Sequence, residues 1–161
     1  MRKVVNINEL VGIREKVKKE GGKVVFTNGC FDILHRGHVD YLEKAKKLGD
    51  ILIVGLNSDE SVKKIKGKKR PIVPQDDRVM VLSALGCVDY VCIFDQETPG
   101  ELIEKIIPDV LVKGGDWEKE NIVGRKIVEE NGGEVFAIPE VEGKSTQKII
   151  QTIIDKYCKS K

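Results

Sequence analysis

Short apolar runs alternate along the chain with longer segments in which apolar residues recur at helical spacing. The runs are rich in Val and Ile and show little polar alternation, so both faces of each strand are expected to be buried. This pattern is typical of βαβ units that build a parallel sheet. The expected strands are residues 23–27, 51–56, 90–94, 110–113 and 134–138.

Helical periodicity fills the intervals between these strands, and glycine or proline stands at several helix ends, such as Gly21-Gly22 and Pro99. The expected helices are residues 7–19, 37–48, 60–65, 75–85, 99–107, 122–131 and 145–157. The sequence therefore predicts one α/β domain over residues 1–161, with an N-terminal helix within 1–20 and a C-terminal helix within 145–158. We expect a Rossmann-like, doubly wound fold with a five-stranded parallel sheet and helices on both faces.

Composition narrows the class of protein. The 161 residues are 40% hydrophobic and 34% charged, which is ordinary for a globular domain. A net charge of +2 is too small to indicate a nucleic-acid partner. No apolar run is long enough for a signal peptide or a membrane span, and the cysteines lack CxxC spacing, so we expect a reduced, cytoplasmic protein without a membrane partner. The cysteines are Cys30, Cys87, Cys92 and Cys158.

The turn after the first strand carries the strongest chemical signal. It reads NGCFDILHRGH and holds the only two histidines of the chain, His35 and His38. In an open parallel sheet, ligands bind at the carboxyl ends of the strands, and the start of a helix favours phosphate. A metal site would need further ligands, and neither the GxGxxG fingerprint nor a P-loop is present. The turn therefore indicates a nucleotide-handling site, with no protein metal site.

At these residues the sequence resembles a known family. GxFDxxHxGH resembles the motif of the HxGH nucleotidylyltransferases, and His35-Arg36-Gly37-His38 is that motif as it stands here. The segments NSDESVKKIKGKKRPIVPQDDRVMVLSAL, VDYVCIFDQETPGELIEKIIPDVLVKGGDW and GKSTQKII are similar to the heptose 1-phosphate adenylyltransferases. Glycerol-3-phosphate cytidylyltransferase is a more distant likeness.

The resemblance implies a transferase that moves AMP from ATP to heptose 1-phosphate, giving pyrophosphate and ADP-heptose, a lipopolysaccharide precursor. It implies Mg²⁺ bound mainly through ATP, a homodimer, and a separate kinase that supplies the sugar phosphate. A phosphate monoester is already largely a dianion at pH 7, so this chemistry needs no general base, and none is evident. Donors that stabilise the growing charge take its place.

The residues expected at the site fall into three groups. The catalytic residues are expected to be His35, His38 and Lys113. The nucleotide contacts are expected to be Thr27, Asn28, Gly29, Cys30, Phe31, Gly37, Lys113, Ser145, Thr146 and Lys148. The contacts to the sugar phosphate are expected to be Asp32, Arg70, Arg78, Gly115, Asp116 and Trp117.

Several of these assignments have plainer alternatives. The basic run at residues 63–71 is either a solvated loop or a flap over polyphosphate, in which Arg70 is the preferred phosphate partner. Arg78 could serve as a surface ion-pair residue, and Ser145 and Thr146 could simply cap the last helix. Relatives usually carry a second threonine where this chain has Gln147.

The sequence leaves two other functions open and disfavours a third. The chain could be a cytidylyltransferase for glycerol 3-phosphate or another small phosphate ester. It could be a nucleotide-binding domain without catalysis, a reading that Gln147 slightly favours. An RNA-binding module built on KKIKGKKR is disfavoured because the aromatic platform of such surfaces is lacking.

Overall fold

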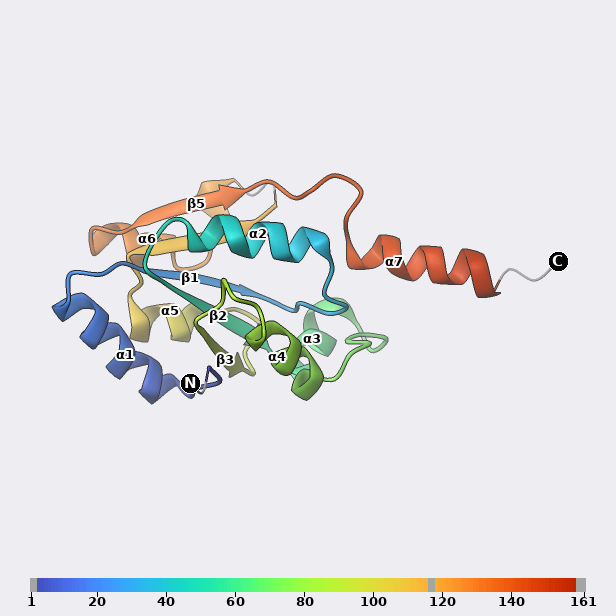
Figure 1. Ribbon diagram of the computed structural model, residues 1–161, viewed down its shortest axis with the longest axis horizontal. Coiled ribbons are helices and arrows are strands. Elements are labelled where there is room, and N and C mark those ends of the chain that lie inside the picture. The colour runs from blue at the N-terminus through green and yellow to red at the C-terminus, as the bar shows by residue number, and fades with distance from the viewer. Residues whose placement is uncertain (1–2, 116–117, 159–161) are drawn as a thin grey trace.

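Five parallel strands form one sheet in the computed structural model, which describes residues 3–115 and 118–158 (Figure 1). Their order across the sheet is β3-β2-β1-β4-β5, so β1 is central. The chain runs outward from β1 through β2 to β3 and then crosses back to place β4 on the other side of β1. This confirms the predicted α/β fold. The strands are β1 (Val24–Gly29), β2 (Ile51–Asn57), β3 (Tyr90–Phe94), β4 (Val110–Gly114) and β5 (Glu134–Ile138).

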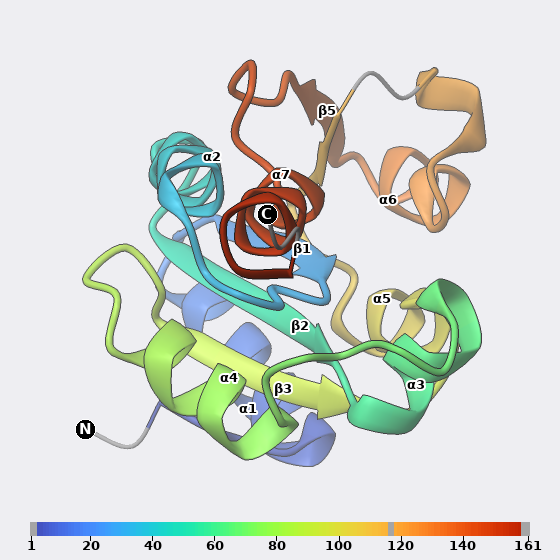
Figure 2. The same ribbon diagram turned by 90° about the vertical axis from the view of Figure 1, so that its right-hand side faces the viewer.

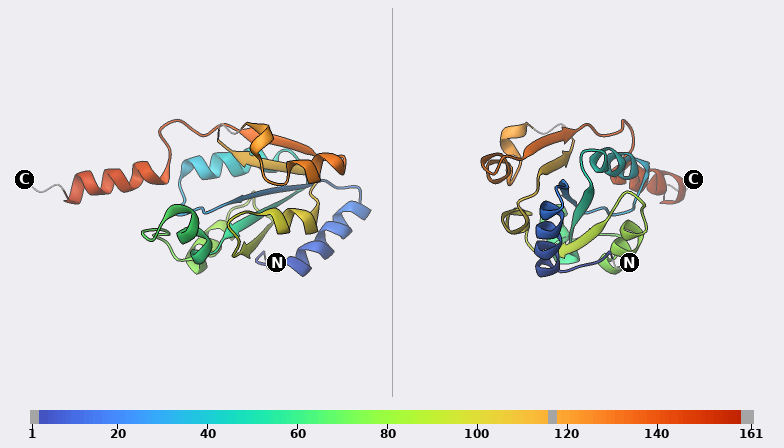
Figure 3. Two further views of the ribbon diagram at one scale, coloured as in Figure 1. Left: turned by 180° about the vertical axis from the view of Figure 1, so that it is seen from behind. Right: turned by 60° about the vertical axis from the view of Figure 1, so that its left-hand side comes forward.

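Helices cover both faces of the sheet, as the views in Figure 3 show. On one face, Leu10, Ile103 and Val128 from three helices pack against side chains of the strands. On the other, Leu42 and Leu82 from two further helices do the same. The first face is covered by α1 (Ile7–Lys19), α5 (Gly100–Ile106) and α6 (Arg125–Glu130), and the second by α2 (Arg36–Lys46) and α4 (Gln75–Ser83).

The ladders on the two sides of β1 differ in length. Pairing between β1 and β2 continues from Val24↔Ile51 to Gly29↔Leu56. Pairing between β1 and β4 is confined to Val25↔Val110 and Phe26↔Leu111. Beyond Phe26, β1 and β4 are therefore no longer joined by ladder pairs, and this is the point where an open α/β sheet places its ligand.

Two helices differ from expectation. Residues 122–131 were expected to be one helix, but a 3₁₀ turn, η1 (Lys119–Asn121), comes first and α6 begins only at Arg125. Gly124 has φ +85°, and a Cβ there would lie 2.6 Å from Ile103, so the backbone leaves helical geometry at this glycine. The C-terminal helix is α7 (Thr146–Ile153), followed by a π-helical turn, η2 (Ile154–Cys158).

The last helix projects from the carboxyl edge of the sheet. Figure 1 shows α7 extending away from the domain, and Figure 2 shows it end-on in front of β1 and near α2. The remaining helix, α3 (Asp59–Lys66), follows β2 at the same edge. No helix among the described residues is long and apolar enough to cross a membrane.

Candidate active site

The turn between β1 and α2 is strained and tightly held. Phe31 and Ile33 both have positive φ, 45° and 55°, a conformation that costs a residue other than glycine about 1–3 kcal/mol. Phe31 is buried, and a Cβ at Gly29 would lie 3.0 Å from its ring, so glycine leaves room for Phe31 to fold inward. The packing that holds this conformation also fixes where the following histidines lie.

His35 is the N-cap of α2, and its Nδ1 accepts a hydrogen bond of 3.1 Å from the backbone N–H of Gly37. Because Nδ1 accepts, the proton of the neutral ring is on Nε2, which becomes a donor. The His35 and His38 rings are stacked, with centroids 3.9 Å apart and planes 20° from parallel. The predicted pair of imidazoles is therefore a pair in space.

Both rings favour the neutral form. Burial lowers the pKa of His38 to about 4, and the neighbouring His35 adds to this shift. Burial also lowers the pKa of His35, although Glu140 opposes it. Nδ1 of His38 is buried and has no hydrogen-bond partner among the described residues. A buried nitrogen without a partner is costly, and a ligand oxygen could satisfy it.

Lys113 reaches the same edge from β4. Its ammonium donates to Oδ1 of Asn28 at 3.2 Å, which ties the end of β4 to the end of β1 beyond their last ladder pair. Burial lowers the pKa of Lys113, and Lys66 adds to the shift. A partly buried ammonium at this position strengthens the attraction for an anionic ligand because less water screens it.

The GKST segment lies against the histidine turn although more than one hundred residues separate them. The Thr146 hydroxyl donates to the Asp32 carbonyl at 2.7 Å, and Ser145 caps α7 by accepting from the Lys148 N–H at 3.2 Å. A Cβ at Gly37 would lie 3.1 Å from the Lys144 carbonyl oxygen, so this glycine permits the close approach. The N-termini of α2 and α7 thus meet at one place, and both favour anions.

Asp32 has a role that the sequence did not reveal. Its side chain is fully buried and accepts hydrogen bonds from Arg70 Nε at 2.5 Å and from the N–H groups of Ile72 and Val73 at 2.9 Å each. Burial by itself would raise the pKa of Asp32, but the two backbone donors and the Arg70 guanidinium together hold it below its usual value. Asp32 therefore anchors the loop that follows the basic run.

Arg78 is likewise an internal hub. It is buried, and its guanidinium donates to the carbonyl oxygens of Val73, Cys30 and Asn57 and forms an ion pair of 2.7 Å with Asp59. The alternative of a surface ion pair is therefore wrong. Arg78 thus joins the histidine turn, the end of β2, the start of α3 and the loop before α4 from inside the fold.

The other predicted site residues differ in burial and in hydrogen bonding. Thr27 is fully buried with its hydroxyl bound by Tyr41, and burial raises the pKa of the Cys30 thiol. Lys148 is exposed on α7, whereas Gly115 has φ +105° and donates to the Ile138 carbonyl. Asp116 and Trp117 lie outside the described residues.

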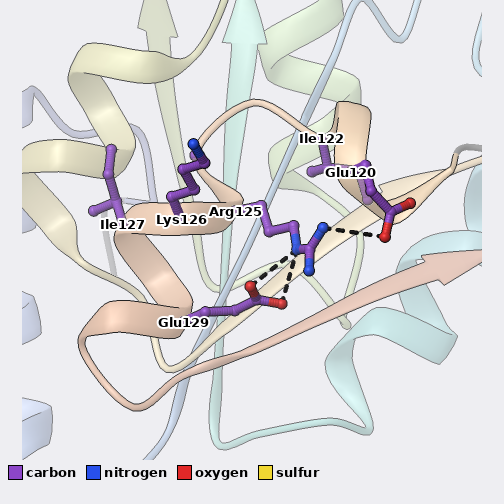
Figure 4. A pocket seen from close by; sticks show the side chains of 7 residues that line it. Glu120, Ile122, Arg125, Lys126, Ile127 and Glu129 are labelled. Atoms are coloured by element: carbon purple, nitrogen blue, oxygen red, sulfur yellow. Dashed lines mark hydrogen bonds and ion pairs between the residues drawn. The ribbon is translucent and has the colours of Figure 1, made fainter.

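A separate hollow of about 550 Å³ lies between η1 and α6 (Figure 4). Arg125 spans it in ion pairs with Glu129 at 2.9 Å and Glu120 at 3.2 Å, so these charges satisfy one another. Because α6 covers the opposite face of the sheet from α2, this hollow is not part of the histidine site. The described residues contain no cluster of three metal-ligating side chains.

Comparison with known proteins identifies the family that the chain matches. Residues 26–156 match the model of the family described as cytidylyltransferase-like. "Bifunctional protein HldE" of Campylobacter concisus (strain 13826) is 59% identical over 153 residues, which is 95% of this chain and 31% of that protein. The protein of the same name from Geobacter metallireducens is 53% identical over 155 residues, 96% of this chain and 32% of the relative. The chain thus spans about a third of the length of these relatives.

Solved structures share the fold. A lipopolysaccharide core biosynthesis protein from Thermoplasma volcanium GSS1 superposes with a TM-score of 0.62 at 29% identity, covering 75% of this chain and 98% of that one. Pantoate-beta-alanine ligase from Francisella tularensis gives 0.61 at 15% identity, covering 99% and 80%, which shows the fold alone. The HxGH turn, the doubly wound sheet and the extent of the family match lead to one conclusion: this chain belongs to the cytidylyltransferase-like family.

Proposed function

We propose that the chain is an adenylyltransferase that transfers AMP from ATP to heptose 1-phosphate, releasing pyrophosphate and ADP-heptose. The observation that carries this proposal is the stacked pair His35 and His38 at the joint N-termini of α2 and α7. The match to HldE over nearly the whole chain supports the same activity. The sugar phosphate would come from a kinase activity outside these 161 residues, and the reaction would take place in the cytoplasm.

In this proposal the chain stabilises charge and moves no proton. An oxygen of the sugar phosphate attacks the α-phosphorus of ATP, the bond to pyrophosphate breaks, and negative charge grows on the non-bridging and leaving oxygens. His35 Nε2–H donates to one of these oxygens, and His38 and the Lys113 ammonium hold others. Because both rings are neutral before ATP binds, they serve as hydrogen-bond donors rather than as fixed cations.

Mg²⁺ fits this site only as a companion of the nucleotide. Asp32, the carboxylate of the histidine turn, is fully buried and engaged by Arg70 and two backbone N–H groups, so it has little capacity left for a metal. ATP oxygens and water would therefore hold the ion. When bound, Mg²⁺ supplies neutralisation of polyphosphate charge.

A homodimer is part of the proposal. No side chain of α7 or η2 is buried, and Ile153, Ile154 and Tyr157 are 48%, 40% and 80% exposed. A second copy that covers these side chains would remove apolar surface from water. Light scattering on the purified chain tests this, with a dimer mass expected and a monomer mass at micromolar concentration counting against it.

His38→Ala tests the proposed chemistry. We expect the variant to fold and to lose about a hundred- to a thousand-fold in turnover, as when one donor to a developing oxyanion is removed. Lys47→Ala, at the exposed end of the same helix, is the matched control and should keep wild-type turnover. Equal pyrophosphate release by wild type and His38→Ala would refute the assignment.

A further inference from the structure

A tyrosine bridges β1 and β4 just beyond the last ladder pair between these two strands. Tyr41 lies on α2, three residues after His38, and its hydroxyl contacts both Thr27 of β1 and Val112 of β4. The distances are 2.5 Å from Tyr41 Oη to Thr27 Oγ1 and 3.2 Å from Oη to the Val112 carbonyl oxygen. The last ladder pair between the two strands is Phe26↔Leu111, one residue before this bridge.

The direction of the two hydrogen bonds follows from the groups involved. A carbonyl oxygen can only accept, so the Tyr41 hydroxyl donates its proton to Val112. The Thr27 hydroxyl then donates to Tyr41 Oη. Burial raises the pKa of Tyr41, so its hydroxyl keeps the proton that this arrangement needs.

The bridge connects the groups assigned to catalysis. Thr27 precedes Asn28 and Val112 precedes Lys113, and Asn28 and Lys113 are themselves hydrogen-bonded at 3.2 Å. The Tyr41 ring also packs on Gly114, where a Cβ would lie 3.3 Å from the ring. Tyr41 thereby fixes the helix that carries His38 against both strands, next to the residue that carries the ammonium.

We propose that Tyr41 is a positioning residue that sets the separation of His38, on α2, from Lys113, at the end of β4. This inference rests on the proposed function, since it assigns Tyr41 a part in that reaction. A hydrogen-bonded hydroxyl suits this task because removing it leaves the ring in place and releases only the tie between the strands. The effect of its loss should therefore fall on turnover more than on nucleotide binding.

The experiment compares Tyr41→Phe with wild type and with Tyr90→Phe, a tyrosine of the distant strand β3. Turnover is measured with ATP and heptose 1-phosphate, and ATP affinity is measured by titration followed in the histidine side-chain NMR signals. For Tyr41→Phe we expect about a tenfold lower kcat, ATP affinity within about twofold of wild type, and a shifted His38 signal. Tyr90→Phe should match wild type in all three.

A second variant keeps the test decisive. Thr27→Val removes the other hydroxyl of the bridge, so the double variant should lose no more in kcat than Tyr41→Phe alone. Wild-type kcat in Tyr41→Phe, or losses that multiply in the double variant, would overturn the inference. An inactive wild type would instead contradict the proposed function, while the His38 signal, recorded without turnover, would still report whether the bridge positions the ring.

Discussion

At the residue scale, the proposed chemistry depends on the protonation states of His35 and His38. The pKa of His38 is about 4 in the folded chain, whereas the ordinary pKa of a histidine is 6.5. Between these values the unfolded chain binds the proton more readily than the folded one, so stability is lost as the pH falls. The cause is burial of the ring together with the stacked His35.

This shift predicts a measurable pH dependence of stability. Lowering the pH from 7 to 5 should remove about 2 kcal/mol of unfolding free energy through His38. This pH interval covers most of the gap between the pKa of His38 in the unfolded chain and its pKa in the folded chain. His38→Gln lacks this group and should lose correspondingly less over the same interval. Urea unfolding of both proteins at the two pH values measures it, and parallel losses would show that His38 is not buried in its neutral form.

A second residue-scale prediction concerns Arg78. Arg78→Lys keeps the charge but cannot reproduce four hydrogen bonds to four separate partners, and the buried ammonium would lack acceptors that it can reach. We expect a loss of about 3 kcal/mol in unfolding free energy. The control is Arg36→Lys on the exposed start of α2, which should change stability by less than about 0.5 kcal/mol. Equal stability of the two variants would contradict the internal role of Arg78.

At the scale of elements, the junction of α2 and α7 depends on one glycine. In Gly37→Ala the new Cβ would lie 3.0 Å from the His35 ring and 3.1 Å from the Lys144 carbonyl oxygen, so the ring or the start of α7 must shift. We expect turnover to fall about tenfold or more while the fold persists. Steady-state kinetics and a thermal melt separate the two effects.

The matched control for that variant is Gly12→Ala. Gly12 lies in α1, and a Cβ there would meet nothing within 4 Å. This change should raise stability by about 0.5–1 kcal/mol through helix propensity and leave turnover unchanged. If both variants behaved alike, the close approach at Gly37 would have no catalytic consequence.

Elements also show how far sequence reasoning reaches. The strands were predictable because their Val- and Ile-rich runs are buried on both faces, and the helical start at HRGH was predictable from its motif. The break before α6 was not, because it depends on Gly124 lying against Ile103 of another helix. The positions of Arg70 and Arg78 were also out of reach, because basic side chains carry no local signal of whether they face a substrate or a buried carboxylate.

At the scale of the whole molecule, the carboxyl edge of the sheet brings together segments that are distant in sequence. Asp32 and Arg78 tie the loop at residues 70–73 to the histidine turn, and Thr146 ties α7 to the same turn. A ligand site at the carboxyl ends of the strands was implied by the expected fold, whereas the strand order and the long-range hydrogen bonds appear only in three dimensions.

Asp32→Asn tests this connection. Loss of the charge weakens the bond to Arg70, and an amide can accept with only one oxygen, so the loop at residues 70–73 should open more often. Hydrogen exchange at the amides of Ile72 and Val73 should rise about tenfold or more, while exchange in β1 stays unchanged. Unaltered exchange at the two loop amides would show that Asp32 does not anchor the loop.

The most direct test of the account is a pyrophosphate-release assay on the purified chain, with ATP or CTP paired with heptose 1-phosphate or glycerol 3-phosphate. We expect release with ATP and heptose 1-phosphate to exceed every other pair by at least about a hundredfold, and to disappear in His38→Ala. Preference for CTP, or ATP binding without pyrophosphate release from any pair, would contradict it.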